Sequence, residues 1–189
     1  MGLIGSRDLT ACSGSPTFHR GSALGTGFSD GSTVERSMII DEEHLEELPA
    51  GCAMVDGCFD PLHKGHTEYF RQASLLQVPV LCNLASDAYI RSHKGRSPLL
   101  AEDHRAAVID AIRHISYVFV SRHGTCWSLK RLRPAYYVKG LDWRGRLPEE
   151  QVAACRQSGI EIVFVDCQLA SSSGILNGFL KGMQGQTSV

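Results

Sequence analysis

Short apolar runs alternate with segments of helical periodicity from residue 52 to residue 180, and this alternation constrains the fold more than any other feature of the chain. The strand-like runs are Cys52–Val55, Val78–Ala85, Tyr117–Ser121, Ala135–Lys139 and Glu161–Val165. The helix-like segments are Thr67–Leu76, Glu102–His114, Cys126–Leu132, Glu149–Ser158 and Ser173–Leu180. Such alternation predicts an α/β protein with a single doubly wound parallel sheet and right-handed crossovers. In sheets of this kind the ligand binds beyond the carboxyl ends of the strands.

Two histidines three residues apart lie where the first apolar run passes into a helix, in the stretch Gly57-Cys58-Phe59-Asp60-Pro61-Leu62-His63-Lys64-Gly65-His66. If the helix begins near Lys64, its first amides point outward and the helix dipole adds positive charge there, which favours an anion. The spacing of His63 and His66 places both side chains on one face. Gly65 leaves room for a ligand to approach the backbone. The stretch therefore predicts a phosphate-binding loop.

This stretch resembles the HxGH signature of the nucleotidyltransferase superfamily, which includes glycerol-phosphate and phosphoethanolamine cytidylyltransferases and heptose-phosphate adenylyltransferases. Five further elements follow in the family's order, and together they cover about residues 52 to 180. They are Ser86-Asp87, Lys94-Gly95-Arg96 with Pro98, Glu102-Asp103-His104-Arg105, Val138-Lys139-Gly140-Leu141-Asp142-Trp143 and Ser171-Ser172-Ser173-Gly174-Ile175. The resemblance implies a Rossmann-like nucleotidyltransferase fold.

The resemblance also implies a reaction, in which a phosphate oxygen of a phosphorylated sugar or alcohol attacks the α-phosphorus of CTP or ATP and releases pyrophosphate. Such transfer depends on aligning two anions and stabilising the charge on the phosphoryl oxygens, so it needs no enzyme nucleophile. The catalytic residues that it implies are His63, His66, Lys139 and Arg105. The implied nucleotide-binding residues are Gly57, Cys58, Phe59, Asp60, Gly65, Asp87, Lys94, Arg96, Asp142, Trp143, Ser171, Ser172 and Ser173. Mg²⁺ would accompany the triphosphate, without a dedicated carboxylate cage, and a homodimer follows from the resemblance alone.

The sequence alone leaves several alternatives open. Lys139 is also explained as a solvated charge at a strand end, Arg105 as a brace for its own helix and the three serines as a helix N-cap. Asp87, Lys94 and Arg96 lie in what is interpreted as a polar loop, where plain solvation is the simpler explanation. The alternative functions are synthesis of FAD from FMN and ATP, and a non-catalytic nucleotide-binding module.

Two departures from the family patterns leave the nucleotide undecided between CTP and ATP. Where glycerol-phosphate cytidylyltransferases carry Arg-Thr-Glu-Gly before the serine turn, this chain has Asp166-Cys167-Gln168-Leu169-Ala170. Three serines also replace the more usual Ser-Thr-Thr, which keeps the hydroxyl groups. The segments around Lys94 and Lys139 are closer to those of the heptose-phosphate adenylyltransferases.

Composition predicts a cytoplasmic enzyme. The 189 residues are 43% hydrophobic, enough for one core, and hold no apolar run long enough to cross a bilayer. The seven cysteines form no CxxC pair or zinc-finger spacing, and the first residues lack the apolar centre of a secretory signal. Residues 51–189 hold 16 basic and 12 acidic side chains, an excess too small and too dispersed for a nucleic-acid groove. We therefore expect neither nucleic acid nor membrane as a partner.

The first part of the chain differs from the rest. Residues 1–37 contain seven glycines and seven serines with little periodicity, which is typical of a flexible tail. The acidic segment Asp41–Leu48 predicts one short helix that caps the core or contacts a second subunit. The predicted organisation is a tail with a short acidic helix at 1–50 and a nucleotidyltransferase domain at 51–189.

Overall fold

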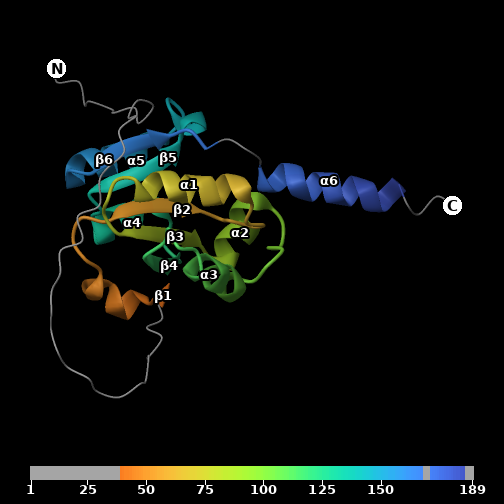
Figure 1. Ribbon diagram of the computed structural model, residues 1–189, viewed down its shortest axis with the longest axis horizontal. Helices are drawn as coiled ribbons and strands as arrows, with labels where there is room; N and C mark the ends of the chain where they lie inside the picture. Colours follow the sequence, from red (N-terminus) through yellow and green to blue (C-terminus); the bar gives the residue numbers. More distant parts are fainter. Residues whose placement is uncertain (1–38, 168–170, 186–189) are drawn as a thin grey trace, which may run out of the picture.

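The computed structural model describes residues 39–167 and 171–185, and these residues form one parallel sheet with helices on both faces (Figure 1). The strands are β1 (Ile39–Ile40), β2 (Ala53–Gly57), β3 (Val80–Ala85), β4 (Tyr117–Ser121), β5 (Tyr136–Gly140) and β6 (Glu161–Val165). The helices are α1 (Lys64–Ser74), α2 (Asp87–Lys94), α3 (Glu102–Asp110), α4 (Thr125–Leu132), α5 (Glu149–Ser158) and α6 (Ser172–Gly185), with 3-10 helices η1 (Glu42–Glu47) and η2 (Leu141–Trp143). The predicted doubly wound α/β fold is confirmed.

The strand order β1-β4-β3-β2-β5-β6 places a change of direction at β2. The chain moves from β2 through β3 to β4 on one side, and it returns to β5 and β6 on the other side. β2 and β5 are paired in register, with Ala53 opposite Tyr136. Ligands of open α/β sheets bind outside the carboxyl ends of the strands at such a switch point. The histidine motif follows β2, so the topology places it at that position.

Successive side chains of each strand point to opposite faces of the sheet and form two cores. On one face Val55 packs in a cluster with Phe70 of α1 and Ile109 of α3. On the other face Met54 packs in a cluster with Leu129 of α4 and Ala154 of α5. The carboxyl edge of the sheet is therefore flanked by α1 on one face and by α4 and α5 on the other.

Helix α2 corrects the prediction that Asp87 and Lys94 lie in a polar loop. The Ser86 hydroxyl caps this helix by accepting from the Tyr89 amide over 3.3 Å, and Gly95 ends it in the left-handed conformation with φ 63°. The segment buries only Ile90 among its own residues, so its composition resembles that of a loop. The capping residues at its two ends therefore indicate this helix, whereas the apolar pattern of the segment does not.

The acidic segment before β2 belongs to the packed structure. Leu45 of η1 lies in the core on the α4 and α5 face, and Glu46 pairs with Arg131 of α4 over 2.7 Å. The predicted short acidic helix is thus a 3-10 helix that covers the core. The predicted Gly/Ser-rich tail lies in residues 1–37, outside the described residues.

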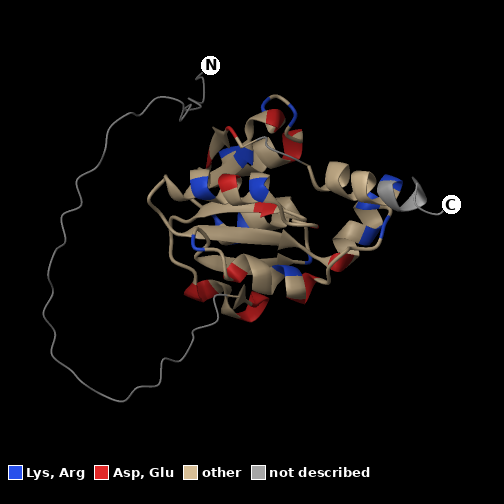
Figure 2. Cartoon of the chain, turned by 45° about the vertical axis from the view of Figure 1, so that its right-hand side comes forward, with Lys and Arg blue, Asp and Glu red and all other residues tan. Residues whose placement is uncertain are grey.

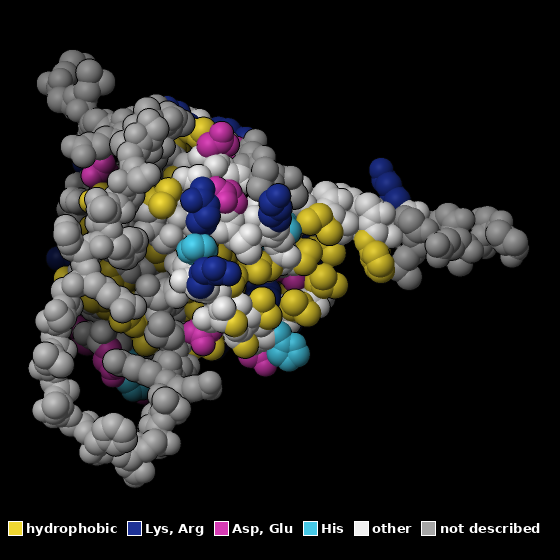
Figure 3. All heavy atoms as spheres, in the orientation of Figure 1, with side chains coloured by type: hydrophobic (Ala, Val, Ile, Leu, Met, Phe, Trp, Pro, Cys, Tyr) yellow, Lys and Arg dark blue, Asp and Glu magenta, His cyan; other side chains and the backbone are white. Residues whose placement is uncertain are grey.

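Helix α6 projects from the body of the molecule (Figures 1 and 3). Hydrophobic side chains gather where the helix leaves the body, as Figure 3 shows. Figure 2 shows lysines and arginines spread over several helices and loops of the described part of the chain. None of the helices in residues 39–167 and 171–185 combines the length and apolar character that a membrane span requires.

Candidate active site

The histidine motif forms the connection between β2 and α1. α1 begins at Lys64, as predicted, and His63 is its N-cap. The backbone of His63 is extended there, with φ −148°, and its Nδ1 accepts a hydrogen bond from the Gly65 amide over 3.1 Å. One of the first amides of the helix is satisfied by an imidazole, in place of the usual Ser, Thr, Asn or Asp.

The two imidazoles form a stacked pair. The ring centroids of His63 and His66 are 3.7 Å apart with planes inclined by 20°, and the Phe59 ring meets His66 edge-on at 4.9 Å. Nε2 of His63 and Nδ1 of His66 are buried without a hydrogen-bond partner among the described residues. Buried polar atoms are rarely left unpaired in folded proteins, so these two nitrogens mark a place where a ligand is expected.

Both imidazoles are neutral at neutral pH. Burial and the neighbouring His63 lower the pKa of His66 from 6.5 to about 4, and burial lowers the pKa of His63. Because Nδ1 of His63 accepts from Gly65, the ring proton of the neutral form lies on Nε2. His63 can therefore donate a hydrogen bond to a ligand through the same nitrogen that lacks a partner.

A cavity of about 880 Å³ opens at the carboxyl edge of the sheet beside the imidazole pair. Fifteen of the residues predicted to form the site line it, and they come from both halves of the chain. They are Gly57, Cys58, Phe59, Asp60, His63, Gly65, His66, Lys94, Arg96, Lys139, Asp142, Trp143, Ser171, Ser172 and Ser173. The fold thus brings the motif, the end of β5 and the start of α6 to one cavity.

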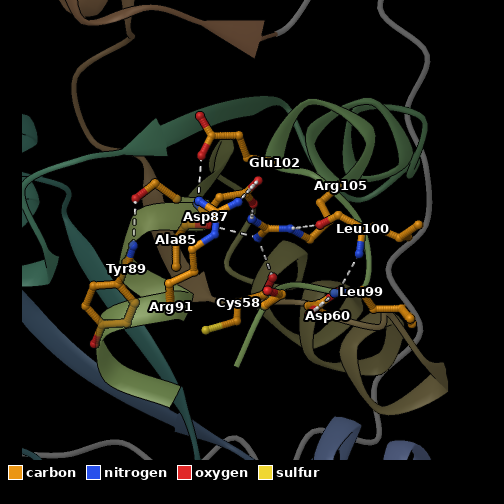
Figure 4. Close-up of polar contacts among 12 residues, drawn as sticks. Cys58, Asp60, Ala85, Asp87, Tyr89, Arg91, Leu99, Leu100, Glu102 and Arg105 are labelled. Atoms are coloured by element: carbon orange, nitrogen blue, oxygen red, sulfur yellow. Dashed lines mark hydrogen bonds and ion pairs between the residues drawn. The ribbon is translucent and has the colours of Figure 1, made fainter. Parts of the chain in front are cut away.

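Arg105 and Asp87 do not line this cavity. Arg105 is 2% exposed, and its guanidinium donates to the carbonyls of Cys58, Ala85 and Leu100 over 2.7–3.0 Å and to the Asp87 carboxylate over 2.7 Å (Figure 4). These contacts join the loops after β2 and β3 to the segment before α3. Arg105 therefore braces the loops that form the walls of the site. Its contacts extend beyond its own helix, to which the alternative explanation had limited them.

Asp60 has a similar bracing position. Its carboxylate is buried and accepts from the amides of Leu99 and Leu100 over 2.9–3.0 Å (Figure 4). The same carboxylate pairs with Arg96 over 2.6 Å. Burial alone would raise the pKa of Asp60, but these hydrogen bonds and the Arg96 charge hold it below the usual value. The loop that carries Arg96 is thereby fastened to the histidine motif.

The serine turn both caps α6 and lines the cavity. The Ser171 hydroxyl accepts from the Gly174 amide over 3.1 Å, and the Ser172 hydroxyl donates to the Pro61 carbonyl over 3.0 Å. The N-cap alternative is therefore confirmed, and it coexists with a place in the cavity wall. The Ser172 contact ties the start of α6 directly to the motif.

Lys139, predicted from the resemblance, is buried rather than solvated. Its Nζ lies 2.8 Å from Oδ1 of Asp56 and 4.4 Å from the centroid of the Trp143 ring. Asp56 is the last residue before the motif and was not predicted, although a carboxylate at the end of an apolar strand is a signal that could have identified it. The other described lining residues that sequence reasoning missed are Tyr69, Asn83, Ala85, Tyr89, Ser121, Gly124, Thr125, Gly140, Pro148, Gln151 and Cys167. Most of them lie at or just after the carboxyl ends of strands.

The cavity offers neither a reactive thiol nor a metal cage among the described residues. Burial raises the pKa of Cys58 and, with Asp142 and Asp166 nearby, raises that of Cys167 to about 11, so both thiols stay protonated. In residues 39–167 and 171–185 no three His, Cys, Asp or Glu side chains gather in a way that could hold a metal ion. The two cysteines of the lining are therefore poor nucleophiles.

Comparisons with known proteins agree with the geometry. "Bifunctional protein HldE" from Geobacter sulfurreducens is 36% identical over 130 residues, which cover 67% of this chain and 26% of that protein. Its counterpart in Syntrophotalea carbinolica is 43% identical over 90 residues, which cover 47% of this chain and 18% of that protein. The chain therefore spans a minor part of the length of the curated relatives that it matches.

A solved structure shares the fold. The lipopolysaccharide core biosynthesis protein from Thermoplasma volcanium matches with a TM-score of 0.55 and 23% identity, over 63% of this chain and 98% of that chain. The family model described as "Cytidylyltransferase-like" matches residues 54–172, which include the imidazole pair and Lys139. Since that match spans more than half of the chain, the protein belongs to the cytidylyltransferase-like family of the nucleotidyltransferase superfamily.

Proposed function

We propose that the protein transfers the nucleoside monophosphate of ATP or CTP to a sugar phosphate and releases pyrophosphate. The observation that carries this proposal is a pair of buried imidazole nitrogens that have no hydrogen-bond partner among the described residues and that lie in a cavity at the N-terminus of α1 together with Lys139. A helix N-terminus with outward amides favours a phosphate group. Neutral imidazole donors and one lysine supply hydrogen bonds and charge without leaving several cations buried together.

In the proposed reaction, an oxygen of the acceptor phosphate forms a bond to the α-phosphorus of the triphosphate. The bond from that phosphorus to the bridging oxygen breaks, and pyrophosphate leaves with the electron pair. His63 donates from Nε2 and His66 presents Nδ1 to the same region, so they hold the phosphoryl oxygens in line. Lys139 adds positive charge where negative charge builds up in the transition state.

The two halves of the cavity differ in polarity, and this difference supports the choice of acceptor. Lys94 and Arg96 line the cavity on the side of the motif, which suits the polyanionic triphosphate. The lining from the α4 and α5 face includes Asn83 and Gln151, whose amides match the hydroxyl groups of a sugar. A volume of about 880 Å³ suits a nucleotide together with a small acceptor.

Mg²⁺ is proposed to bind mainly through the triphosphate oxygens and water. When bound, it would neutralise part of the charge of the triphosphate. Among the described residues, the carboxylates of Asp56 and Asp60 are engaged by cationic and hydrogen-bond donors of the protein itself. The protein's own contribution to catalysis therefore comes from its hydrogen-bond donors and from the charge of Lys139.

A pyrophosphate-release assay tests the proposal. The full chain is incubated with Mg²⁺, with ATP or CTP, and with a panel of sugar phosphates, glycerol phosphate and FMN. We expect release with at least one sugar phosphate, and its loss in His66→Ala but not in His104→Ala, whose side chain is exposed on α3. Pyrophosphate release with FMN as the only active acceptor would contradict the proposal and indicate FAD synthesis instead. Binding of triphosphate without release across the panel would identify a non-catalytic binding module.

A homodimer is part of the proposal, on the basis of the family resemblance. Ile175, Phe179 and Leu180 of α6 are 43–65% exposed, which gives a second copy an apolar surface to cover. Sedimentation equilibrium of the full chain, compared with a Phe179→Ser variant, tests this expectation. A monomer at micromolar concentration would contradict it.

A further inference from the structure

Lys139 is a buried cation with a buried partner. It is 7% exposed, and its ion pair with Asp56 has side-chain exposures of 9% and 12%. An ammonium group removed from water is costly unless it is paired and hydrogen-bonded. Asp56 supplies that compensation, so the position of Lys139 depends on a residue 83 positions earlier in the chain.

Asp56 is itself fixed by groups from separate elements. While Oδ1 accepts from Lys139, Oδ2 accepts from the Thr125 hydroxyl of α4 over 3.0 Å and from the Tyr137 hydroxyl of β5 over 3.1 Å. Burial and the nearby Asp56 raise the pKa of Tyr137, so its hydroxyl stays protonated and can donate. Tyr137 also lies 3.1 Å from Oε1 of Gln151 on α5. The carboxylate therefore has a defined orientation.

The ammonium of Lys139 is held between Asp56 and a ring. The Nζ of Lys139 lies 4.4 Å from the centroid of the Trp143 ring, within the range of a cation–π contact. An ammonium has three N–H donors, and Asp56 accepts one of them among the contacts of the described residues. Lys139 lines the cavity with His63 and His66, so its other donors are in a position to reach a phosphate oxygen.

We propose that Asp56 is a positioning residue for the transfer reaction, which holds the Lys139 ammonium at the place where charge develops on the phosphoryl group. This inference rests on the proposed function. Asp56 carries a negative charge in a cavity built for a polyanion, so it opposes the binding of the triphosphate while it aligns the lysine. Its contribution is therefore expected in the transition state rather than in substrate binding.

The inference predicts a division between kcat and KM. In Asp56→Asn the shape is kept and the charge is lost, so we expect kcat to fall by about 10- to 100-fold as Lys139 loses its alignment. KM for the triphosphate stays unchanged or decreases, because a repulsive charge has gone. Glu46→Gln is the matched control, since it removes a carboxylate of an exposed ion pair on η1, outside the cavity, and it should leave both constants unchanged.

Two further variants separate positioning from general damage. Thr125→Val removes one donor to Asp56 and keeps both charges, so kcat should fall by less than in Asp56→Asn with KM again unchanged. In a Lys139→Met background, Asp56→Asn should have little further effect on kcat, because residues that act as a unit are not additive. Thermal unfolding of each variant verifies that it folds. If Asp56→Asn does not fold, the kcat and KM of Thr125→Val decide whether the inference holds.

Three results would overturn the inference: a kcat of Asp56→Asn equal to that of the wild type, additive effects of Asp56 and Lys139, or a raised KM with unchanged kcat. The last result would instead show that Asp56 contacts a substrate.

If the wild-type protein shows no turnover on the whole panel, the proposed function itself has failed. The role of Asp56 is then tested by a measurement of triphosphate binding. In a Trp127→Phe background, Trp143 is the only tryptophan of the chain and reports triphosphate binding by fluorescence. The affinity for the triphosphate should fall in Lys139→Met and should not fall in Asp56→Asn. A similar fall in both variants would overturn the inference.

Discussion

The guanidinium of Arg105 donates to the main-chain carbonyl of Cys58 over 2.7 Å, although the two residues are 47 positions apart. Cys58 lies in the loop that leads to the histidine pair, so an arginine on α3 determines the course of a loop that follows β2. Because the same guanidinium also binds Ala85 and Asp87, the loop after β3 shares this support. Arg105 is thus connected with the site without touching its cavity.

Replacing Arg105 with Ala should lower the free energy of unfolding by about 3–5 kcal/mol, because three carbonyls and the Asp87 carboxylate lose a buried partner. Urea unfolding measures the change. Arg71→Ala is the control, since its ion pair with Glu68 is exposed and should cost less than about 1 kcal/mol. Unchanged stability combined with a large loss of turnover would show instead that Arg105 acts directly on substrate.

Replacing His66 with Ala should lower kcat by about 10²- to 10³-fold, as expected when one donor to the developing charge is removed. The fold should persist, because His66 lies at the open end of the helix and not in the sheet core. Circular dichroism and pyrophosphate release give the two measurements. Turnover within a few-fold of the wild type would exclude His66 from the reaction.

Acid should destabilise the protein through His66. The neutral ring is favoured in the folded state, so the unfolded chain binds the proton first as pH falls below 6.5. The free energy of unfolding should therefore decrease between pH 6.5 and about 4, on the order of 1 kcal/mol per pH unit. Urea unfolding at pH 7 and pH 5 should show a smaller decrease for His66→Phe, which does not titrate. Parallel curves for the two proteins would contradict the assignment.

Replacing Gly65 with Ala should reduce activity more than stability. A Cβ at this position would lie 3.0 Å from Cε1 and 3.1 Å from Nδ1 of His63, so the ring must move from its stacked position. Alanine also favours helix by about 1 kcal/mol, which offsets part of the strain. Gly178→Ala on α6 is the matched control, because an added Cβ there meets no atom within 4 Å. Equal activity of the two variants would show that the ring position does not matter.

Much of the fold and the motif could be predicted from local sequence. Strands such as β4 and β6 are short apolar runs that match the predicted bounds, and the start of α1 follows from the spacing around Lys64. These features depend on neighbouring residues. Helix α2 was missed because one buried residue, Ile90, cannot create a periodic pattern, whereas caps at its two ends define it.

The contacts that complete the site could not be predicted in the same way. The pairing of Asp56 with Lys139 depends on two strands that lie side by side at the switch point of the sheet. The inward direction of Arg105 depends on carbonyl groups, which carry no sequence signal. A motif identifies which residues meet at the cavity, but the hydrogen-bond geometry decides which of them face it.

The N-cap role of His63 has a consequence for protein engineering. One nitrogen of the His63 ring caps α1 and the other faces the cavity, so the start of the helix and the chemistry of the site depend on the same ring. Protonating His63 would remove the acceptor that holds the Gly65 amide, and the first turn of the helix would loosen with it. A variant with altered basicity at position 63 must therefore also supply a new way to start the helix.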